Sequence, residues 1–402
     1  MLKRALFTVV AIFLVLIIVF TVGEICFRLF RRESNPLAEI IQEKKTSLFP
    51  PNIVKDLHSS VKGEFDYTAH INQFGYRGEN FDRTKTPGRI RIFAVGDSFT
   101  FGVGSQDNQT IPYLIEQKLR SQKFDVEVVN AGIGHASPIR HYVNLRDIHL
   151  QYEPDLVLLF FDLTDLWDDW NAEHHALYDS KGEIKSFHPL FVDGKRDWWM
   201  TCVYYSAFCR YINNKMVRTF KKMHTLGFWN YMKAAVQGKR AKALIANSKS
   251  VDAKTTMEYD ALVLMRGREK EELIRAHWPR TVKYLLKIKA MLDERHIPFV
   301  MVMYPHGIYV GKSQWDEGRT TWGFEKDKQY TDYFPFELGA SFAKENQIPL
   351  INTLDSFLKA DPGKKYFFDW DGHMTPEANK IVAEKIAKDP AVQKILKQLE
   401  KK

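Results

Sequence analysis

The sequence has few of the residues that would place it among disulfide-stapled or disordered proteins. It contains 3 cysteines, 16 prolines and 22 glycines in 402 residues. Three cysteines cannot build a disulfide framework, and so few prolines and glycines exclude a collagen-like or low-complexity chain. Hydrophobic residues make up 45% of the sequence and charged residues 27%, which predicts a globular protein with a substantial core.

The sequence also lacks a basic block interleaved with aromatic residues. Lys and Arg number 58 against 49 Asp and Glu, a net charge of +9. The basic residues occur in scattered pairs such as Lys44-Lys45 and Lys401-Lys402. A groove for nucleic acid combines a basic track with stacking aromatics. We therefore expect no nucleic-acid partner, and instead a solvated basic surface near anionic lipid.

A long hydrophobic run stands near the N-terminus. No charged residue occurs from Ala5 through Gly23, a run of 19 residues that are mostly Val, Ile, Leu and Phe. At about 1.5 Å per residue, such a helix approaches the ~30 Å hydrocarbon thickness of a bilayer. Glu24 and Arg28 follow where a signal peptide would show small residues and a cleavage site. The pattern predicts a tail and anchor at residues 1–24 that contacts the membrane through residues 5–23.

The flanks of this run bear on its orientation. Lys3 and Arg4 precede it, and arginines also follow it. A short basic tail ahead of an apolar run resembles a signal-anchor, which predicts a single-pass protein with the large domain outside the cytoplasm. Cys202 and Cys209 are compatible with an oxidising compartment. They can bridge on a loop but lie too far apart on one helix, so the sequence leaves this disulfide open.

Beyond the anchor, residues 25–87 contain several prolines and little long periodicity, which predicts a juxtamembrane stalk or wrapping segment. Five short apolar runs then read as buried strands: Arg89–Val95, Val126–Val129, Leu156–Phe161, Ile297–Met303 and Ile348–Ile351. Helical patterns lie between them, among them Pro112–Leu119, Ile139–Leu150, Val282–Leu292 and Phe336–Lys344. The alternation predicts an α/β fold with a parallel sheet covered on both faces. The stretch of about 167–280 breaks this rhythm and reads as a helical insertion.

The first strand ends in Gly96-Asp97-Ser98, followed by a short helical pattern. In an open parallel sheet, ligands bind at the carboxyl ends of the strands. A glycine permits the tight turn, and the backbone N–H groups that open the next helix can face an oxyanion. Ser98 is therefore a candidate nucleophile, although this motif alone is also typical of ordinary caps and turns.

A histidine flanked by carboxylates lies near the C-terminus. Thr375 and Pro376 look like the N-cap and first position of the final helix, so His373 lies on the loop before it. This loop follows the fifth strand and reaches the same edge of the sheet as Ser98. A serine needs a base to remove its proton, and Asp371 is close enough in sequence to orient the imidazole of His373. The alternative is a loop histidine without a chemical role.

With both motifs in view, the chain resembles the SGNH/GDSL hydrolase family of esterases and acyltransferases. The resemblance covers roughly residues 72–388, and the lead-in Ile71–Gly78 is similar to the segment before the first strand in membrane-anchored bacterial members. It implies a flavodoxin-like three-layer α/β/α fold with a five-stranded parallel sheet. The hydrolase-like domain would then span residues 88–402, with the helical cap insertion at about 167–280.

The same resemblance implies roles for the candidate residues. Ser98 would be the nucleophile, His373 the base and Asp371 the acid that orients it. The family's aspartate usually stands three residues before the histidine, where this sequence has Trp370, so Asp369 is the alternative acid.

The resemblance further implies an oxyanion hole that includes the backbone N–H of Ser98. Where the family has a glycine after the second strand, this sequence has His135, preceded by Gly134. Where the family has an asparagine after the third strand, it has Thr164. A threonine hydroxyl is shorter than an amide and donates one bond, and the loss of an oxyanion donor costs about 100 to 1,000-fold in turnover.

No metal or cofactor is expected. The acidic residues after the third strand are Asp162, Asp165, Asp168 and Asp169. They lack the glycine and terminal glutamate of a calcium loop and are typical of a helix N-terminus. His306, after the fourth strand, is a candidate substrate contact, with a structural loop residue as the alternative.

These features predict a membrane-anchored serine ester hydrolase or O-acyltransferase that acts on an acylated envelope glycan or lipid. The substrate class rests on location and resemblance, because fold does not determine substrate. The alternative is a non-catalytic, membrane-tethered glycan-binding or assembly protein that keeps a degraded site. Thr164 is the feature that favours this alternative.

Overall fold

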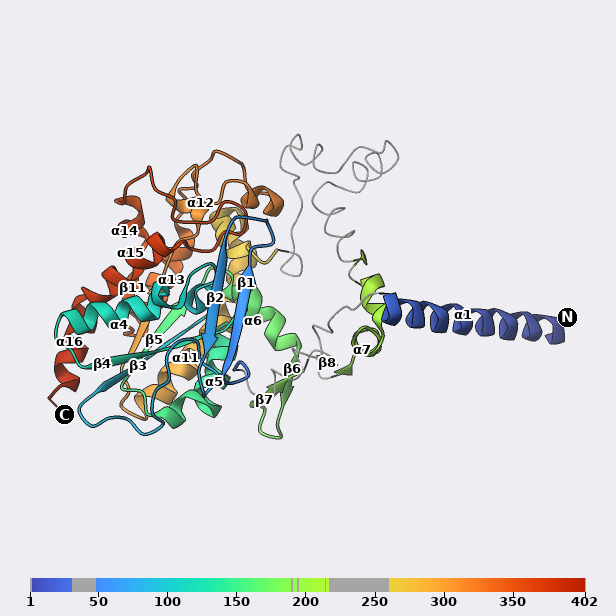
Figure 1. The fold of residues 1–402 in the computed structure, drawn as a ribbon, viewed down its shortest axis with the longest axis horizontal. Coiled ribbons are helices and arrows are strands. Elements are labelled where there is room, and N and C mark those ends of the chain that lie inside the picture. The colour runs from blue at the N-terminus through green and yellow to red at the C-terminus, as the bar shows by residue number, and fades with distance from the viewer. Residues whose placement is uncertain are drawn as a thin grey trace. The chain divides into compact units, whose positions relative to one another are not determined.

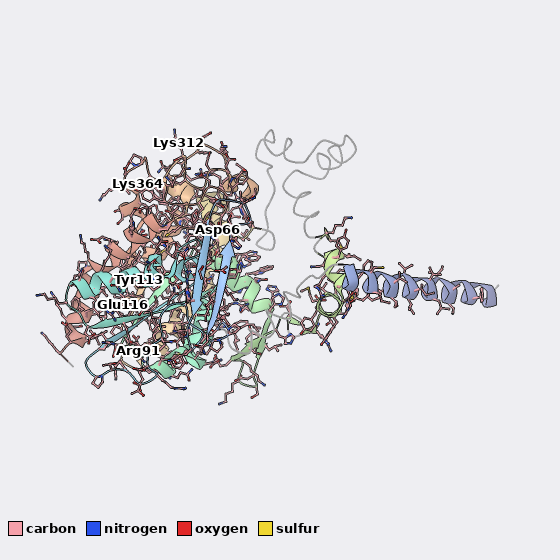
Figure 2. The ribbon with its side chains drawn as sticks, viewed as in Figure 1. Asp66, Arg91, Tyr113, Glu116, Lys312 and Lys364 are labelled. Carbon is pink, nitrogen blue, oxygen red and sulfur yellow. A yellow bond between two sulfur atoms is a disulfide. The ribbon has the colours of Figure 1, made fainter. Side chains whose placement is uncertain are left out.

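The computed structural model describes residues 2–30, 48–188, 191–193, 195–213, 215–216 and 260–401. The chain forms two compact units, shown as a ribbon in Figure 1 and with side chains in Figure 2. The first unit combines Met1–Thr46 with His174–Ser248, and the second combines Ser47–Glu173 with Lys249–Lys402. The insertion expected at about 167–280 falls in both units, and its residues 217–259 lie outside the described part.

Five parallel strands build the second unit, in the order β11-β10-β5-β3-β4. Their bounds are β3 Ile90–Gly96, β4 Val126–Gly132, β5 Leu156–Phe161, β10 Phe299–Met303 and β11 Leu350–Asn352. Every residue of β3, β5 and β10 is buried, because helices cover both faces of the sheet. The α/β fold with a five-stranded parallel sheet, predicted from the sequence, is confirmed.

The helices that pack against this sheet divide between its two faces (Figure 1). The main ones are α4 Ile111–Ser121, α5 Pro138–Asp147, α11 Glu271–Asp293, α13 Phe334–Glu345 and α15 Pro376–Ala387. The chain moves from β3 to β4 in one direction and from β4 to β5, β10 and β11 in the other. Right-handed crossovers therefore place α4 on the face opposite α5, α11 and α13. The contacts agree, since α4 packs with α15 and α5 packs with α11.

Shorter helices complete this unit. The α-helices are α3 Ser98–Phe101, α6 Asp165–His174, α12 Gly307–Val310, α14 Leu354–Leu358 and α16 Pro390–Leu399. The 3-10 helices are η1 Asp107–Gln109, η2 His149–Tyr152, η3 Val263–Lys270 and η4 Gly318–Trp322. Several of them follow strand ends, where they shape the edge of the sheet that holds Ser98.

β3 differs from its predicted bounds by one residue at each end, and β4, β10 and β11 differ by more at one end for physical reasons. Pro298 and Pro349 lie just before β10 and β11. A proline has no backbone N–H to donate to a neighbouring strand, although the carbonyl of each accepts a hydrogen bond from one. These strands therefore begin later than the apolar runs suggest. In contrast, β4 runs on through Asn130, Ala131 and Gly132, which pair with the end of β3.

The segment expected as a stalk contains a β-hairpin. Strands β1 Ile53–His58 and β2 Asp66–Ile71 pair in antiparallel fashion. Tyr67, Ala69 and Ile71 pack with Phe101, so the hairpin covers the turn that follows Ser98. Residues 31–47 of the expected stalk lie outside the described part.

In the first unit, the helix expected near the N-terminus is α1, Leu2–Phe30. The side chains of α1 are described only in part, and among the described residues no helix is long and apolar enough to cross a membrane. The membrane span that the sequence predicts is therefore not supported, and it stays a prediction.

The rest of the first unit contains short elements. These are β6 Ala176–Tyr178, β7 Ile184–Phe187, β8 Phe191–Val192, β9 Lys195–Arg196 and α7 Trp198–Tyr205. Cys202 and Cys209 form a disulfide with their Cα atoms 5.9 Å apart. The pairing is possible because α7 ends at Tyr205, between the two cysteines, so they do not lie on one continuous helix.

Candidate active site

The turn between β3 and α3 presents Ser98 at the carboxyl edge of the sheet. A Cβ added at Gly96 would lie 2.1 Å from Thr100 Oγ1, so only glycine permits this approach of the strand end to α3. Asp97 caps the short helix, and its Oδ1 accepts the backbone N–H of Phe99 at 2.9 Å. The predicted strand-to-helix position of Ser98 is thus the observed one.

Ser98 and His373 meet at this edge. The hydroxyl oxygen of Ser98 lies 2.8 Å from Nε2 of His373. On the other side of the ring, Nδ1 of His373 hydrogen-bonds Oδ1 of Asp371, which also accepts the backbone N–H of His373 at 3.1 Å. Successive hydrogen bonds therefore connect a serine, an imidazole and a carboxylate, and this arrangement can move a proton off the serine.

The alternative acid, Asp369, lies elsewhere. Its Oδ1 accepts a hydrogen bond from Lys365 Nζ at 2.6 Å, and its side chain is 43% exposed. Between Asp371 and His373 the loop turns at Gly372, which has φ +89° and packs against the indole of Trp315. This turn brings Asp371, two residues before His373, back to the imidazole.

The electrostatics of the site favour a charged pair. Burial lowers the pKa of His373, but the hydrogen bond and charge of Asp371, with the charges of Asp97 and Asp162, leave that pKa raised above its ordinary value. Burial raises the pKa of Asp371, and the hydrogen bond and charge of His373 outweigh it and lower that pKa. Asp371 thus stays ionised beside His373, and a carboxylate in this place is able to stabilise a protonated imidazole.

Two buried carboxylates lie beneath Ser98. Asp97 accepts a hydrogen bond from the Tyr304 hydroxyl at 3.0 Å, and burial together with the charge of Asp162 raises the pKa of Asp97 to about 7. Asp162 is fully buried and lies 2.7 Å from His306 Nε2. Burial raises the pKa of Asp162, but His306 and Thr164 lower it by more. His306 was predicted as a substrate contact, but its pairing with Asp162 and the hydrogen bond from Tyr304 to Asp97 were not, because these contacts join residues from different strand ends.

The expected oxyanion donors have unequal roles in the structure. The hydroxyl of Thr164 donates to Asp162 Oδ2 at 2.5 Å and lies 3.1 Å from Asp168 Oδ2. His135 has a left-handed backbone with φ 57° and a side chain that is 90% exposed. A Cβ added at Gly134 would meet no atom within 4 Å. Backbone N–H groups at Ser98 and near His135 are therefore the candidate donors, and Thr164 uses its single proton on a carboxylate.

Ser98 opens into a cavity of about 280 Å³. Most of the predicted site residues line this cavity: Ser98, His135, Thr164, His306, Asp371 and His373. Gly134 and Asp369 do not line it. Aromatic and aliphatic side chains form much of the remaining wall: Phe99, Trp167, Ala261, Leu262, Trp315 and Trp322. A mostly apolar pocket with a few convergent polar groups is typical of a small-molecule site.

The acidic residues after β5 serve structural contacts. Asp162 accepts the backbone N–H of Thr164, and Asp165 accepts that of Asp162, both at 3.0 Å. Asp169 accepts the Thr281 hydroxyl at 2.7 Å. In the described ranges, no group of three or more histidine, cysteine or acidic side chains is arranged to hold a metal ion.

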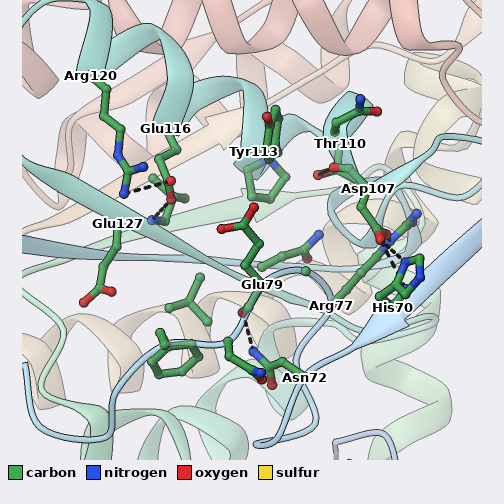
Figure 3. A pocket seen from close by; sticks show the side chains of 18 of the residues that line it. His70, Asn72, Arg77, Glu79, Asp107, Thr110, Tyr113, Glu116, Arg120 and Glu127 are labelled. Carbon is green, nitrogen blue, oxygen red and sulfur yellow. Dashed lines mark hydrogen bonds and ion pairs between the residues drawn. The ribbon is translucent and has the colours of Figure 1, made fainter. Parts of the chain in front are cut away.

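A larger cavity of about 490 Å³ lies along β4, at the opposite edge strand from β11 (Figure 3). None of the predicted site residues lines it. Some of its charged side chains are paired with one another, as Arg77 with Asp107 and Arg120 with Glu116. Arg77 also donates to three backbone carbonyls that follow Ser98, so it supports the turn.

Comparison with known families agrees with this geometry. Residues 92–252 match the family described as GDSL-like Lipase/Acylhydrolase. The chain carries a GDSL-like lipase/acylhydrolase domain. Ser98 lies within the matched segment, whereas Asp371 and His373 of this GDSL-like domain lie beyond its end.

Several solved structures are similar to the chain at low identity. An acetyl xylan esterase, AlAXEase, is 14% identical with a TM-score of 0.35, over 74% of this chain and 97% of that one. A lipase/acylhydrolase from Enterococcus faecalis is 12% identical with a TM-score of 0.34, over 77% and 96%. A two-domain esterase active on acetylated mannans is 11% identical with a TM-score of 0.34, over 78% and 50%. No curated protein matches the chain.

Proposed function

We propose that the protein is a serine ester hydrolase or O-acyltransferase that works through Ser98, His373 and Asp371. The observation that carries this proposal is the 2.8 Å contact between Ser98 Oγ and His373 Nε2, with Asp371 on the other ring nitrogen. Ser98 attacks the acyl carbonyl as His373 takes its proton. His373 then returns that proton to the leaving alcohol, and the acyl-enzyme passes to water or to a sugar hydroxyl.

Labelling by a serine-reactive fluorophosphonate tests this proposal on the full chain in detergent. We expect labelling that is lost in Ser98→Ala and strongly slowed in His373→Ala, since the hydroxyl is then not activated. Ser121→Ala is a control, because that serine is exposed at the end of α4 and does not line the cavity beside Ser98. Labelling that persists in Ser98→Ala, or none in the unaltered folded chain, would reject the triad.

For the substrate, an acylated envelope glycan or lipid fits best. The cavity beside Ser98 combines indole rings with a few polar groups, which suits a sugar that has both an apolar face and hydroxyls. The related acetyl xylan and mannan esterases have names consistent with such substrates but lie far from this chain in sequence. Release of acetate from acetylated polysaccharides, measured against Ser98→Ala, tests the substrate class.

Anchoring in a membrane is the second part of the proposal. The uncharged run from Ala5 through Gly23 supports it, and the Cys202–Cys209 disulfide is compatible with a domain outside the cytoplasm. An alkaline phosphatase fused at the C-terminus should then be active. An inactive phosphatase together with a bright cytoplasmic fluorescent reporter at the same position would reverse the orientation.

A non-catalytic glycan-binding or assembly protein is the second candidate function. The observation that favours it is the hydroxyl of Thr164, which is bound to Asp162 and so leaves the oxyanion site without its side-chain donor. Binding of an acetylated glycan by a chain that shows neither Ser98-dependent labelling nor turnover would select this function.

A further inference from the structure

The active-site cavity contains a second histidine–carboxylate pair. His306 Nε2 lies 2.7 Å from Asp162 Oδ1, and the two side chains are only 6% and 0% exposed. The ring of Phe99 contacts both imidazoles, with centroids 4.6 Å from that of His373 and 5.0 Å from that of His306. The second pair is therefore close to Ser98 and shares its cavity.

The hydrogen bonds of this pair determine which ring atom a ligand can reach. Asp162 also accepts the hydroxyl and the backbone N–H of Thr164, so it acts as an acceptor and His306 Nε2 as the donor. Among the described residues, Nδ1 of His306 has no hydrogen-bond partner, and the ring lines the cavity. In the neutral ring, Nδ1 is then an acceptor held in a fixed direction by the buried carboxylate.

We infer that His306 is a specificity-determining residue that accepts a hydrogen bond from a hydroxyl of the substrate's alcohol portion, and that Asp162 is its positioning residue. The inference rests on the proposed esterase function and names a feature of its substrate. A site with a buried polar group rejects analogues that leave this group unpaired.

The surroundings of His306 indicate a hydroxylated ring rather than a simple alkyl alcohol. Trp315 packs near the imidazole, with ring centroids 6.5 Å apart, and Trp167 and Trp322 line the same cavity. Indoles cover the apolar face of a ring, while Nδ1 offers one directed acceptor. A saccharide has both an apolar ring face for the indoles and hydroxyls that can donate to Nδ1. An alkyl alcohol portion has only apolar surface.

Two substitutions at His306 separate its two ring nitrogens. In His306→Gln the side-chain amide reaches the position of Nε2 and keeps a donor for Asp162, but nothing replaces Nδ1. In His306→Asn the amide lies near the position of Nδ1 and offers an acceptor to the ligand. The glutamine variant keeps the buried carboxylate paired, which guards against simple misfolding.

The substrates form a matched pair: methyl 6-O-acetyl-glucopyranoside and cyclohexylmethyl acetate. Both carry an acetyl ester on a six-membered ring, and only the first has ring hydroxyls. With the full chain in detergent, we expect His306→Gln to lower the ratio of kcat/KM between sugar ester and ring analogue by about 10-fold, mainly through KM. His306→Asn should recover part of this ratio. An equal loss on both esters would show a structural role and overturn the inference.

The acyl side of the ester is tested in the same way with cyclohexylmethyl glycolate. This ester carries its hydroxyl on the acyl group. If His306→Gln lowers kcat/KM for the glycolate but not for the sugar ester, the assignment to the alcohol portion is overturned.

Binding to the Ser98→Ala protein gives a readout that needs no turnover. We expect His306→Gln in this background to weaken binding of the sugar ester about 10-fold, as followed by NMR of labelled histidine. Unchanged binding overturns the inference even if the chain hydrolyses esters. Weakened binding supports it even if no ester is turned over, in which case only the proposed catalysis fails.

Discussion

The hydroxyl of Thr164 donates its proton to the buried carboxylate of Asp162 across 2.5 Å. A hydroxyl has one proton to donate, and Asp162 is ionised because His306 and Thr164 stabilise its charge. Thr164, the residue expected to supply a side-chain donor at the oxyanion site, therefore takes part in a carboxylate network. This relationship connects the proposed oxyanion hole with the second histidine of the cavity.

Thr164 substitutions should measure this connection. Thr164→Val keeps the shape and removes the hydroxyl, so turnover of an activated ester should fall by no more than about 3-fold, against about 100 to 1,000-fold for the loss of a true oxyanion donor. Thr164→Asn adds a longer amide donor and should raise turnover by up to about 100-fold. A 100-fold loss in Thr164→Val would show that the hydroxyl leaves Asp162 for the oxyanion during the reaction.

The two aspartates of the C-terminal loop should behave differently. Asp371→Asn removes the carboxylate on His373 Nδ1, and turnover should fall by about 10⁴-fold. Asp369→Asn is the matched control, because that side chain pairs with Lys365 and is partly exposed, so it should change turnover by less than about 3-fold. Steady-state kinetics on one activated ester compare them. The reverse order of effects would assign the orienting role to Asp369.

The pH dependence of activity should follow His373. Only the neutral imidazole can accept the serine proton, and the pKa of His373 is raised, so kcat/KM should rise along a limb above the ordinary histidine range of about 6.5. Asp371→Asn removes a hydrogen bond and a charge that raise this pKa, and should move the limb to lower pH. A limb that stays in place in Asp371→Asn would contradict this origin of the shift.

The same shift affects stability with a defined sign. Because the pKa of His373 is higher in the fold than in the unfolded chain, its protonation stabilises the fold below the unfolded pKa. This contribution is lost as pH rises through the folded pKa. We measure the free energy of unfolding by urea, with the full chain in detergent. As pH rises, it should fall less in His373→Gln than in the unaltered protein, and an equal fall in both would reject this prediction.

Two other buried histidines should limit stability in acid. Burial lowers the pKa of His141 and of His149 to about 3, so in the fold both remain neutral where the unfolded chain binds protons. From about pH 6.5 downwards, each should lower the free energy of unfolding by about 1.4 kcal/mol per pH unit until its folded pKa is reached. His141→Gln should reduce this slope by about one proton. His58→Gln, at an exposed position, is the control, and an unchanged slope in His141→Gln would contradict the prediction.

Much of the scaffold could be predicted because its signals are local. Runs such as Leu156–Phe161 are short and apolar at every position, which is typical of a strand buried on both faces, and β5 has these bounds. The position of Ser98 follows from its place directly after such a strand. The β1–β2 hairpin was missed, because residue types in β1 do not follow its alternating burial: Val54 is exposed, whereas Lys55 is half-buried. Contacts with Phe101 stabilise the hairpin instead.

The sequence by itself determined the α/β sheet and the edge at which Ser98 and His373 meet, because strand patterns are local and parallel strands end at a common edge. Only the tertiary structure showed that Asp371 contacts His373 and Asp369 does not. It also paired His306 with Asp162 and turned the Thr164 hydroxyl to the same carboxylate. These contacts join side chains from separate strand ends and loops. Their geometry depends on how the turns orient each side chain, on burial and on the charges around it, and none of these is encoded in the spacing of residues along the chain.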